Sequence, residues 1–351
     1  MTLPSTMRGV VLTGFGGFEK LEWRDDLDVP KPEAGEVLVK VGAAGVNNTD
    51  INTRIGWYSK AVEGATDEGS ASGFAEARDD GWSGAAFAFP RIQGADAAGR
   101  IVAVGAGVAA GRIGERVLVE PVFRDADGGV RYFGSECDGA FADYAVVPAR
   151  HAHAVNTTLC DVELAAFPCS WSAAENMVNR AGVGCGERVL VTGASGGVGS
   201  AAVQLAKRRG AEVSAVVGAS KQSMVAALGA DHVLGRETPL AAGAFDVVID
   251  VVGGPGFGDL LAALRPGGRY ATAGAIAGPV VALDLRDLYL KDLTLFGCTV
   301  LDPEVFPNLV GYIERGEIKP LVGATFPLQA IEAAQRRFLE KHHVGKIVIT
   351  L

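Results

Sequence analysis

The run from Gly193 to Gly199, which reads GASGGVG, is the clearest chemical motif in this sequence. An apolar segment precedes it at 188–192, and a segment with apolar residues on one side follows at 199–209, which predicts a strand, a tight turn and a helix. Glycines let the backbone approach a pyrophosphate closely, and a helix N-terminus offers it free N–H groups. This pattern favours a dinucleotide site over a purely structural turn. The residues predicted to face the pyrophosphate are Ser195, Gly196, Gly197 and Val198.

The end of the next predicted strand, at 212–217, indicates which dinucleotide binds. Chains that bind NAD usually carry an Asp or Glu there for the ribose 2′-hydroxyl. Residues 217–221 read VGASK and contain no acid. Beyond Gly218, Ser220 and Lys221 are suited to hold a 2′-phosphate, which predicts NADPH as the cofactor. The alternative is that Lys221 is a solvated residue at the start of a helix.

Composition excludes several classes of protein. The 351 residues correspond to about two domains. A net charge of −9 without a basic block argues against a nucleic-acid partner. No apolar stretch is long enough to span a membrane, and the start lacks the pattern of a signal peptide. Five cysteines without a CxxC pair fit a reduced, cytoplasmic protein.

Two kinds of element must position the glycine-rich motif. Residues 7–48 read as β, with strand-like runs at 7–13 and 36–46. With further runs at 99–104, 115–119 and 141–147 they predict a small β-barrel or sandwich. From about residue 156, apolar strands alternate with helices, which is typical of a parallel sheet covered on both faces. Further strands are predicted at 293–297 and 346–351, and helices at 305–315 and 328–340. Residues 59–88 have no periodicity and predict a long loop, with a helical turn near 75–78.

Eight short motifs recur in the order that one family uses, and they cover nearly all of the chain except 59–88. They are 45–50 (GVNNTD), 94–105 (GADAAGRIVAVG), 138–148 (DGAFADYAVVP), 193–207, 228–233 (LGADHV), 250–253 (DVVG), 264–269 (LRPGGR) and 345–348 (GKIV). With them the chain resembles the medium-chain dehydrogenase/reductase superfamily, and within it the zinc-independent quinone oxidoreductase branch. The resemblance implies an α/β fold. A GroES-like β-barrel catalytic domain at 1–155, completed by 297–351, would accompany a Rossmann doubly wound parallel-sheet domain at 156–296.

The chain departs from the zinc-dependent members of this family at their ligand positions. Asn47 stands where they have Cys, and Ala95 stands where they have His. Cys169 matches the third ligand, and Asp96 falls where the family often has a carboxylate. One thiolate cannot form a catalytic zinc site with three protein ligands. The segment that carries a structural zinc in such relatives contains only Cys137. We therefore expect no zinc.

Chemistry without a metal favours an activated double bond as the substrate. Hydride addition to a quinone or enone places charge on a conjugated oxygen, which hydrogen-bond donors can stabilise. We therefore predict an NADPH-dependent, zinc-independent oxidoreductase that reduces a quinone or another α,β-unsaturated carbonyl compound. An alcohol or aldehyde oxidoreductase of the same superfamily and a non-catalytic nucleotide-binding protein are the alternatives.

The resemblance also implies roles for particular residues. Asn47 would donate its amide to a substrate carbonyl or bond its own turn, Thr49 matches a proton-relay hydroxyl, and Tyr58 would donate a proton or serve in packing. Val252 and Gly253 would border the adenosine ribose. Lys346 would be a cation near the phosphates or ribose, or else an exposed strand residue. Residues that match the lining of the nicotinamide are Gly274, Ala275, Ile276, Phe296 and Cys298. A homodimer joined through the edge strand near 280–285 is also implied.

Overall fold

A computed structural model describes residues 3–78, 81–84, 86–125 and 128–351 of the protein. The chain divides into two compact units. The first contains Met1–Val62, Asp67–Cys169 and Pro320–Leu351, and the second contains Glu63–Thr66 and Ser170–Lys319.

The boundaries differ from the predicted changes at 155 and 297. Residues 297–319 belong to the second unit because they pack on it through polar contacts. Tyr312 donates a hydrogen bond to Glu175, and Arg208 forms an ion pair with Glu317.

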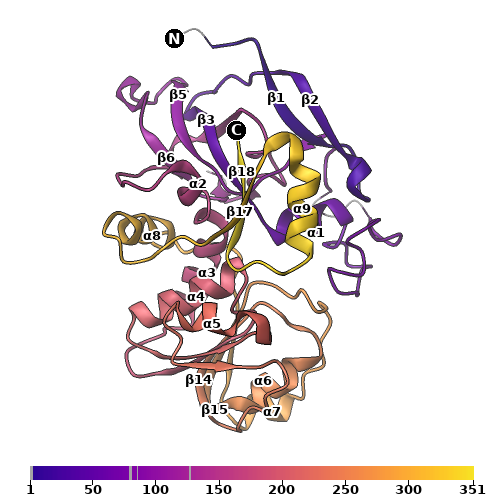
Figure 1. Ribbon diagram of the computed structural model, residues 1–351, viewed down its shortest axis with the longest axis vertical. Coiled ribbons are helices and arrows are strands. Elements are labelled where there is room, and N and C mark those ends of the chain that lie inside the picture. The colour runs from indigo at the N-terminus through magenta and orange to yellow at the C-terminus, as the bar shows by residue number, and fades with distance from the viewer. Residues whose placement is uncertain (1–2, 79–80, 85, 126–127) are drawn as a thin grey trace. The chain divides into compact units, whose positions relative to one another are not determined.

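The first unit is built on a mixed β-sheet. Its described strands run in the order β10-β6-β5-β3-β18-β17, and β9 also pairs with β3. Strand β18, near the end of the chain, is antiparallel to β3, so both ends of the sequence complete this sheet as predicted. Helix α9 (Ile331–Leu339) contacts β17 and β18 (Figure 1). The strands are β3 (Glu36–Val46), β5 (Ala98–Val104), β6 (Arg116–Val119), β9 (Tyr144–Pro148), β10 (Ala152–Ala154), β17 (Val322–Pro327) and β18 (Lys346–Thr350).

Smaller elements complete the first unit. Strand β1 (Thr6–Leu12) pairs with β2 (Leu21–Asp28) and β4 (Arg91–Ile92), and β7 (Val122–Arg124) pairs with β8 (Val130–Tyr132). Helix α1 (Asn48–Ile55) follows β3, and helix α2 (Asp161–Leu164) follows β10. The long segment at 59–88 forms turns, and its described residues contain no helix, so the helical turn expected at 75–78 is absent.

The second unit contains a parallel sheet with the strand order β13-β12-β11-β14-β15-β16. The order reverses beside β11, and ligands bind at the carboxyl ends of the strands at such a reversal. Every residue of β14 is buried, which explains its continuous apolar pattern. Helix α6 contacts β15 and α7 (Figure 1). The strands are β11 (Arg188–Val191), β12 (Glu212–Val216), β13 (His232–Leu234), β14 (Phe245–Asp250), β15 (Leu264–Thr272) and β16 (Thr294–Gly297).

The helices of this region alternate with the strands, as the sequence predicted. Pro168 begins α3, a position where its missing N–H costs the helix no hydrogen bond. The helices are α3 (Pro168–Arg180), α4 (Gly197–Arg208), α5 (Gln222–Ala226), α6 (Phe257–Ala263), α7 (Leu285–Tyr289) and α8 (Val305–Glu314).

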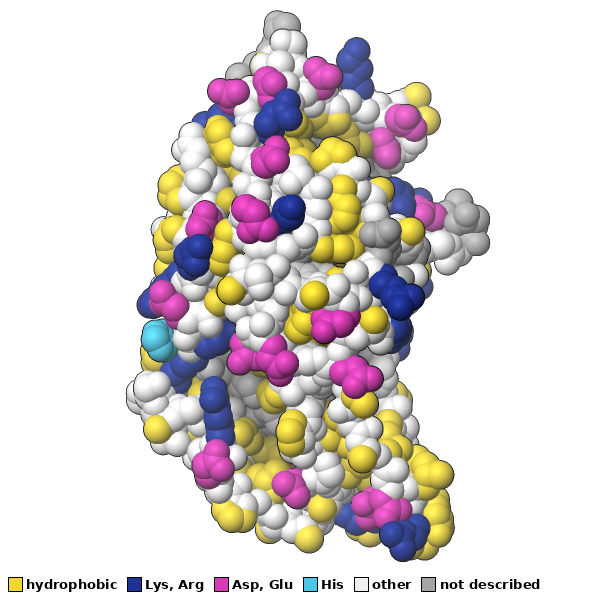
Figure 2. Space-filling model, turned by 90° about the vertical axis from the view of Figure 1, so that its right-hand side faces the viewer, with side chains coloured by type: hydrophobic (Ala, Val, Ile, Leu, Met, Phe, Trp, Pro, Cys, Tyr) yellow, Lys and Arg dark blue, Asp and Glu magenta, His cyan; other side chains and the backbone are white. Residues whose placement is uncertain are grey.

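The surface carries both signs of charge. On the face drawn in Figure 2, the Lys and Arg side chains are interspersed with Asp and Glu side chains, without a continuous basic stripe. Among the described residues, no helix combines the length and the apolar character that crossing a membrane requires.

Candidate functional site

The glycine-rich turn joins β11 to α4 as predicted. Gly193 has a φ of 57°, and its carbonyl oxygen accepts a hydrogen bond of 3.0 Å from the Gly196 amide, which closes the turn. A Cβ on Gly199 would lie 2.3 Å from that same carbonyl oxygen, so a larger residue cannot occupy this position. Helix α4 begins at Gly197, and its first N–H groups have no partner within the helix. This turn fits a pyrophosphate.

Two cations lie beyond the carboxyl end of β12. The ammonium of Lys221 is 3.3 Å from the Ser195 hydroxyl, and the side chain is 8% exposed. The guanidinium of Arg236 lies 3.8–3.9 Å from where a Cβ on Gly218 would be. Burial, and then the charge of Arg236, lower the pKa of Lys221. In the described part of the chain, neither cation forms an ion pair with a carboxylate, so together they are suited to hold an anion. Ser220 is exposed beside them.

Arg236 was missed by sequence reasoning. It follows β13, a strand of only three residues, and β13 is the parallel neighbour of β12. A signal existed, because a basic residue just after a neighbouring parallel strand reaches the same sheet edge as Lys221. The brevity of β13 gave little reason to look there.

The other predicted cofactor residues of the second unit follow neighbouring strands. Val252 and Gly253 follow β14, and Gly274, Ala275 and Ile276 follow β15. The two turns are joined, because the Ala277 amide donates to the Val252 carbonyl at 2.9 Å. Gly253 has a φ of 63° and packs against Ala275. Phe296 lies in β16, and Cys298 is buried just after it.

Lys346 belongs to a buried polar cluster of the first unit. Its ammonium is 2.7 Å from the Asp96 carboxylate and also donates to the Asn47 side-chain oxygen. The Asn47 amide donates to Asp96 at 2.8 Å and to the Gly45 carbonyl at 3.3 Å. The second oxygen of Asp96 accepts the Cys169 backbone N–H. A Cβ on Gly45 would lie 2.2 Å from Asp96, so the cluster also requires glycine at that position.

This cluster changes the expected environment of two residues. Both amide hydrogens of Asn47 already have acceptors within the protein, so they are not available to a substrate carbonyl in this arrangement. Lys346 is 3% exposed, so it is not an ordinary exposed strand residue. Its contact with a nucleotide stays a prediction.

Three protonated acids lie in the same unit. The Tyr58 hydroxyl donates a hydrogen bond of 3.0 Å to Thr49, and the roles expected of both residues stay predictions. The Tyr132 hydroxyl and the Cys169 sulfur share a hydrogen bond of 2.9 Å. Burial raises the pKa of the Cys169 thiol to about 12 and raises the pKa of both phenols above their usual range. All three groups are therefore neutral at pH 7. The sequence carried no signal for Tyr132.

These donors do not fit a catalytic zinc ion. A zinc ligand must be a thiolate, a neutral imidazole or a free carboxylate. Cys169 is bonded to Tyr132, the Asp96 carboxylate is bonded to Lys346, and Ala95 offers no ligand atom. Within the described ranges, no three His, Cys, Asp or Glu residues gather in a way that could hold a metal.

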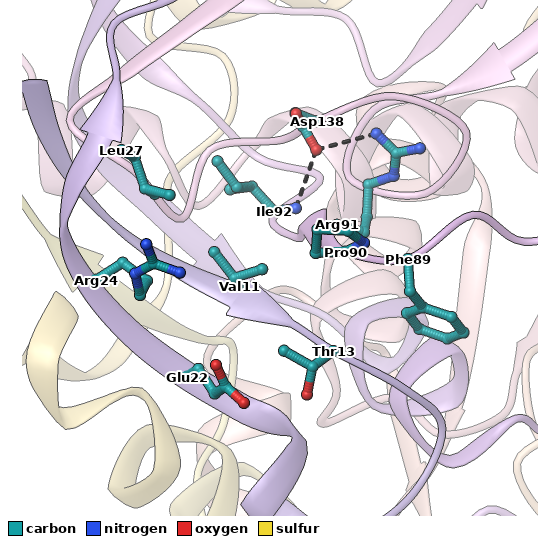
Figure 3. Close-up of a pocket in the computed structure, with 10 residues that line it drawn as sticks. All are labelled: Val11, Thr13, Glu22, Arg24, Leu27, Phe89, Pro90, Arg91, Ile92 and Asp138. Carbon is teal, nitrogen blue, oxygen red and sulfur yellow. Dashed lines mark hydrogen bonds and ion pairs between the residues drawn. The ribbon is translucent and has the colours of Figure 1, made fainter.

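A separate pocket of about 450 Å³ lies between β1, β2 and residues 89–92 (Figure 3). Its wall includes the ion pair of Arg91 with Asp138, whose carboxylate also accepts the Ile92 amide. None of the predicted site residues lines this pocket.

Comparison with known proteins finds two matching family models and several similar relatives. A family model described as "Alcohol dehydrogenase GroES-like domain" matches residues 33–157, and one described as "Zinc-binding dehydrogenase" matches residues 197–315. An acryloyl-coenzyme A reductase of Metallosphaera sedula is 30% identical, over 98% of this chain and 100% of the relative. A quinone oxidoreductase of Rattus norvegicus is 27% identical, over 98% of each chain.

The chain is also similar to solved structures. One is a protein of Sinorhizobium meliloti 1021 whose crystal structure carries a provisional name as an alcohol dehydrogenase. It is 48% identical, with 99% of this chain and 97% of that chain covered and a TM-score of 0.88.

Proposed function

This chain belongs to the medium-chain dehydrogenase/reductase superfamily, and we propose that it is an NADPH-dependent, zinc-independent oxidoreductase that reduces a quinone or another α,β-unsaturated carbonyl compound. The names of two relatives, acryloyl-coenzyme A reductase and quinone oxidoreductase, support a conjugated acceptor. The superfamily consists of oxidoreductases that act on small molecules, and membership in it supports a catalytic function for this chain.

The preference for NADPH rests on the cations beside β12. Lys221 and Arg236 have no acidic partner among the described residues, and no acid occupies 217–221. A 2′-phosphate would neutralise both charges through charge-assisted hydrogen bonds. NADH offers only a hydroxyl at that position, and it would leave both cations without an anion.

When bound, NADPH supplies a hydride, and the protein must then deliver a proton to the reduced substrate. Tyr58 is the candidate proton donor, because a phenol is protonated at neutral pH and this one is hydrogen-bonded to a second hydroxyl. Thr49 accepts the Tyr58 hydrogen bond and is placed to exchange a proton with it. Asn47 holds the Lys346 ammonium and the Asp96 carboxylate together.

The single observation that carries the proposal is the contact of Lys346 with Asp96. It places a lysine ammonium on the carboxylate whose other oxygen accepts the Cys169 amide, next to Ala95, which stands where zinc-dependent members of the family have His. The charge that a metal would supply to Asp96 comes from the chain itself.

Turnover with and without a chelator tests the proposal. NADPH oxidation should be followed with a quinone and with an enone, before and after 1,10-phenanthroline treatment, alongside elemental analysis of the protein. We expect equal rates and no stoichiometric zinc. Activity that disappears with the chelator and returns with zinc contradicts the proposal.

An alcohol or aldehyde oxidoreductase is the second candidate, favoured by the provisional name of the 48% identical protein. A panel of primary and secondary alcohols with NADP⁺, compared with the enones and quinones, separates the two candidates by kcat/KM. A protein that binds NADPH and oxidises it with neither class of substrate would instead be a non-catalytic nucleotide-binding protein.

A homodimer is part of the same proposal. The edge strand expected near 280–285 is wrong, because 280–284 form no strand and the edge of the parallel sheet is β16. Exposed apolar side chains gather in the stretch of sequence from 280 to β16. An exposed sheet edge beside an apolar patch is a typical surface for self-association.

A further inference from the structure

The carboxylate of Asp250 is the most completely bonded acid in the second unit. It is fully buried at the carboxyl end of β14 and accepts four hydrogen bonds. The Thr192 hydroxyl donates to one oxygen, and the Tyr270 hydroxyl donates to the other at 2.5 Å. The backbone amides of Val252 and Gly253 donate at 2.9 and 3.1 Å.

The donors to Asp250 come from three neighbouring strands and the turns that follow them. Thr192 directly precedes the turn that begins at Gly193, and its hydroxyl also accepts the Val251 amide at 3.3 Å. Val252 and Gly253 form the turn after β14. Tyr270 lies in β15, two residues before Thr272, whose hydroxyl donates to the Gly274 carbonyl at 3.1 Å. One carboxylate therefore connects three of the turns that carry predicted nucleotide contacts.

These bonds explain how a buried anion is tolerated without a cation. A carboxylate removed from water needs compensating donors, and four of them are present. The burial of Tyr270, and then the charge of Asp250, raise the pKa of this phenol far above its usual range, so it stays a donor. An amide in place of the carboxylate would turn one acceptor into a donor that faces other donors.

We propose that Asp250 is a positioning residue, which holds the turns after β11, β14 and β15 in the arrangement that binds the dinucleotide, with Thr192 and Tyr270 as its side-chain anchors. This inference rests on the proposed use of NADPH. Asp250 is assigned no contact with the cofactor. It acts through the Gly193 turn, the Val252–Gly253 turn and the turn at Gly274.

The same strand offers a matched control. Asp246 is also buried in β14 and also accepts several hydrogen bonds, from the Arg188 amide and the Arg265 guanidinium. It lies toward the amino end of the strand, away from the three turns. A merely structural role for buried acids of β14 predicts equal effects at both positions, whereas positioning predicts an effect on the nucleotide only at Asp250.

The test compares NADPH binding and stability in Asp250→Asn, Tyr270→Phe, Thr192→Val and Asp246→Asn. Kd is measured by titration of NADPH fluorescence, and Tm by thermal unfolding without the nucleotide. We expect Asp250→Asn to raise Kd at least tenfold and Tyr270→Phe and Thr192→Val to raise it several-fold. Asp246→Asn should lower Tm and leave Kd within twofold of the wild-type value.

Each result of this test supports or contradicts the inference. Wild-type Kd in folded Asp250→Asn and in Tyr270→Phe overturns the inference, as does an equal loss of affinity in Asp246→Asn. If Asp250→Asn does not fold, Tyr270→Phe and Thr192→Val decide by the same criterion. A wild-type protein that binds no NADPH overturns the proposed function, and this inference with it. A wild-type protein that binds NADPH with unaffected variants overturns this inference alone.

Discussion

The ammonium of Lys346 lies 2.7 Å from the carboxylate of Asp96, and both side chains are almost completely removed from water. Lys346 lies in β18 and Asp96 lies just before β5, and the two residues meet because both strands pair with β3. If one residue of the pair is replaced, the other charge stays buried and has lost its partner, but the cost of removing it from water remains. Replacing either residue alone should therefore destabilise the protein.

Removing the ammonium should therefore destabilise the first unit. We expect Lys346→Met to lower the free energy of unfolding by about 3–5 kcal/mol, because Asp96 is left buried without its cation. Asp96→Asn in the same chain should recover part of this loss. Urea unfolding of both single variants and the double variant measures the coupling. Arg8→Met is the control, since it breaks the exposed ion pair with Asp143 and should cost at most about 1 kcal/mol. Equal losses of unfolding free energy in Lys346→Met and Arg8→Met would contradict the expectation.

Asp50 should make stability depend on pH in an unusual direction. Burial raises its pKa from 3.8 to about 7. A carboxyl group whose pKa is higher in the folded state binds more protons there, so its contribution to stability is present below pH 4 and is lost as the pH rises to 7. The slope should reach at most about 1.4 kcal/mol per pH unit.

Unfolding free energies of the wild type and Asp50→Asn at pH 4, 5, 6, 7 and 8 test this dependence. The difference between the two proteins should change steadily in favour of the variant as the pH rises to 7. A difference that stays constant across this range would show that Asp50 ionises normally.

The cations beside β12 should set cofactor preference. Lys221→Ala and Arg236→Ala should each weaken NADPH binding about tenfold, because each removes a charge-assisted hydrogen bond to the 2′-phosphate. NADH binding should change little. Lys319→Ala, which removes an equal charge elsewhere in the second unit, is the control. Fluorescence titration with both nucleotides measures the ratio. Parallel losses for NADH and NADPH would mean that the two cations do not contact the 2′-phosphate.

Tyr58→Phe should slow the reaction without affecting the nucleotide. A positioned general acid typically contributes a factor of about 10²–10⁴, so kcat should fall within that range. Kd for NADPH should be unchanged. Tyr289→Phe, at an exposed phenol of the second unit, should leave kcat unaltered. If Tyr58→Phe retains the wild-type kcat, the proton comes from another group, and Tyr132 is the next to test.

The sequence predicted the second unit well because its elements are local. The strand, turn and helix from Arg188 to Arg208 are encoded by consecutive residues, and the glycines that the turn requires stand within it. Strand β2 escaped notice because its sequence, LEWRDDLD, is mostly charged and mostly exposed. Strand β2 forms because it pairs with β1, and its sequence shows no unbroken alternation of apolar and polar residues.

The polar cluster of the first unit could not be derived in the same way. Asn47 was recognised from its place in a motif, but its bonds depend on Lys346, which lies 299 positions away. Tyr132 approaches Cys169 only because the β7–β8 pair folds back. Contacts between distant segments require the tertiary structure, whereas turns and helix starts are determined nearby.

The exposed apolar stretch of the second unit should join two copies of the chain. Val280 is 65% exposed, Leu285 is 65% exposed and Leu290 is 70% exposed, and all three lie close in sequence to the edge strand β16. Water contact at such a patch is unfavourable by about 25 cal/mol for each Å² of apolar surface, so covering it with a second copy stabilises the dimer.

Leu290→Glu places a charge in that patch and should produce monomers at concentrations where the wild type is dimeric. Light scattering coupled to size-exclusion chromatography measures the mass of each. Ile113→Glu, at an exposed apolar residue of the first unit, should leave the mass unchanged. A wild-type protein that is monomeric throughout, or a Leu290→Glu variant that remains dimeric, shows that another surface is used.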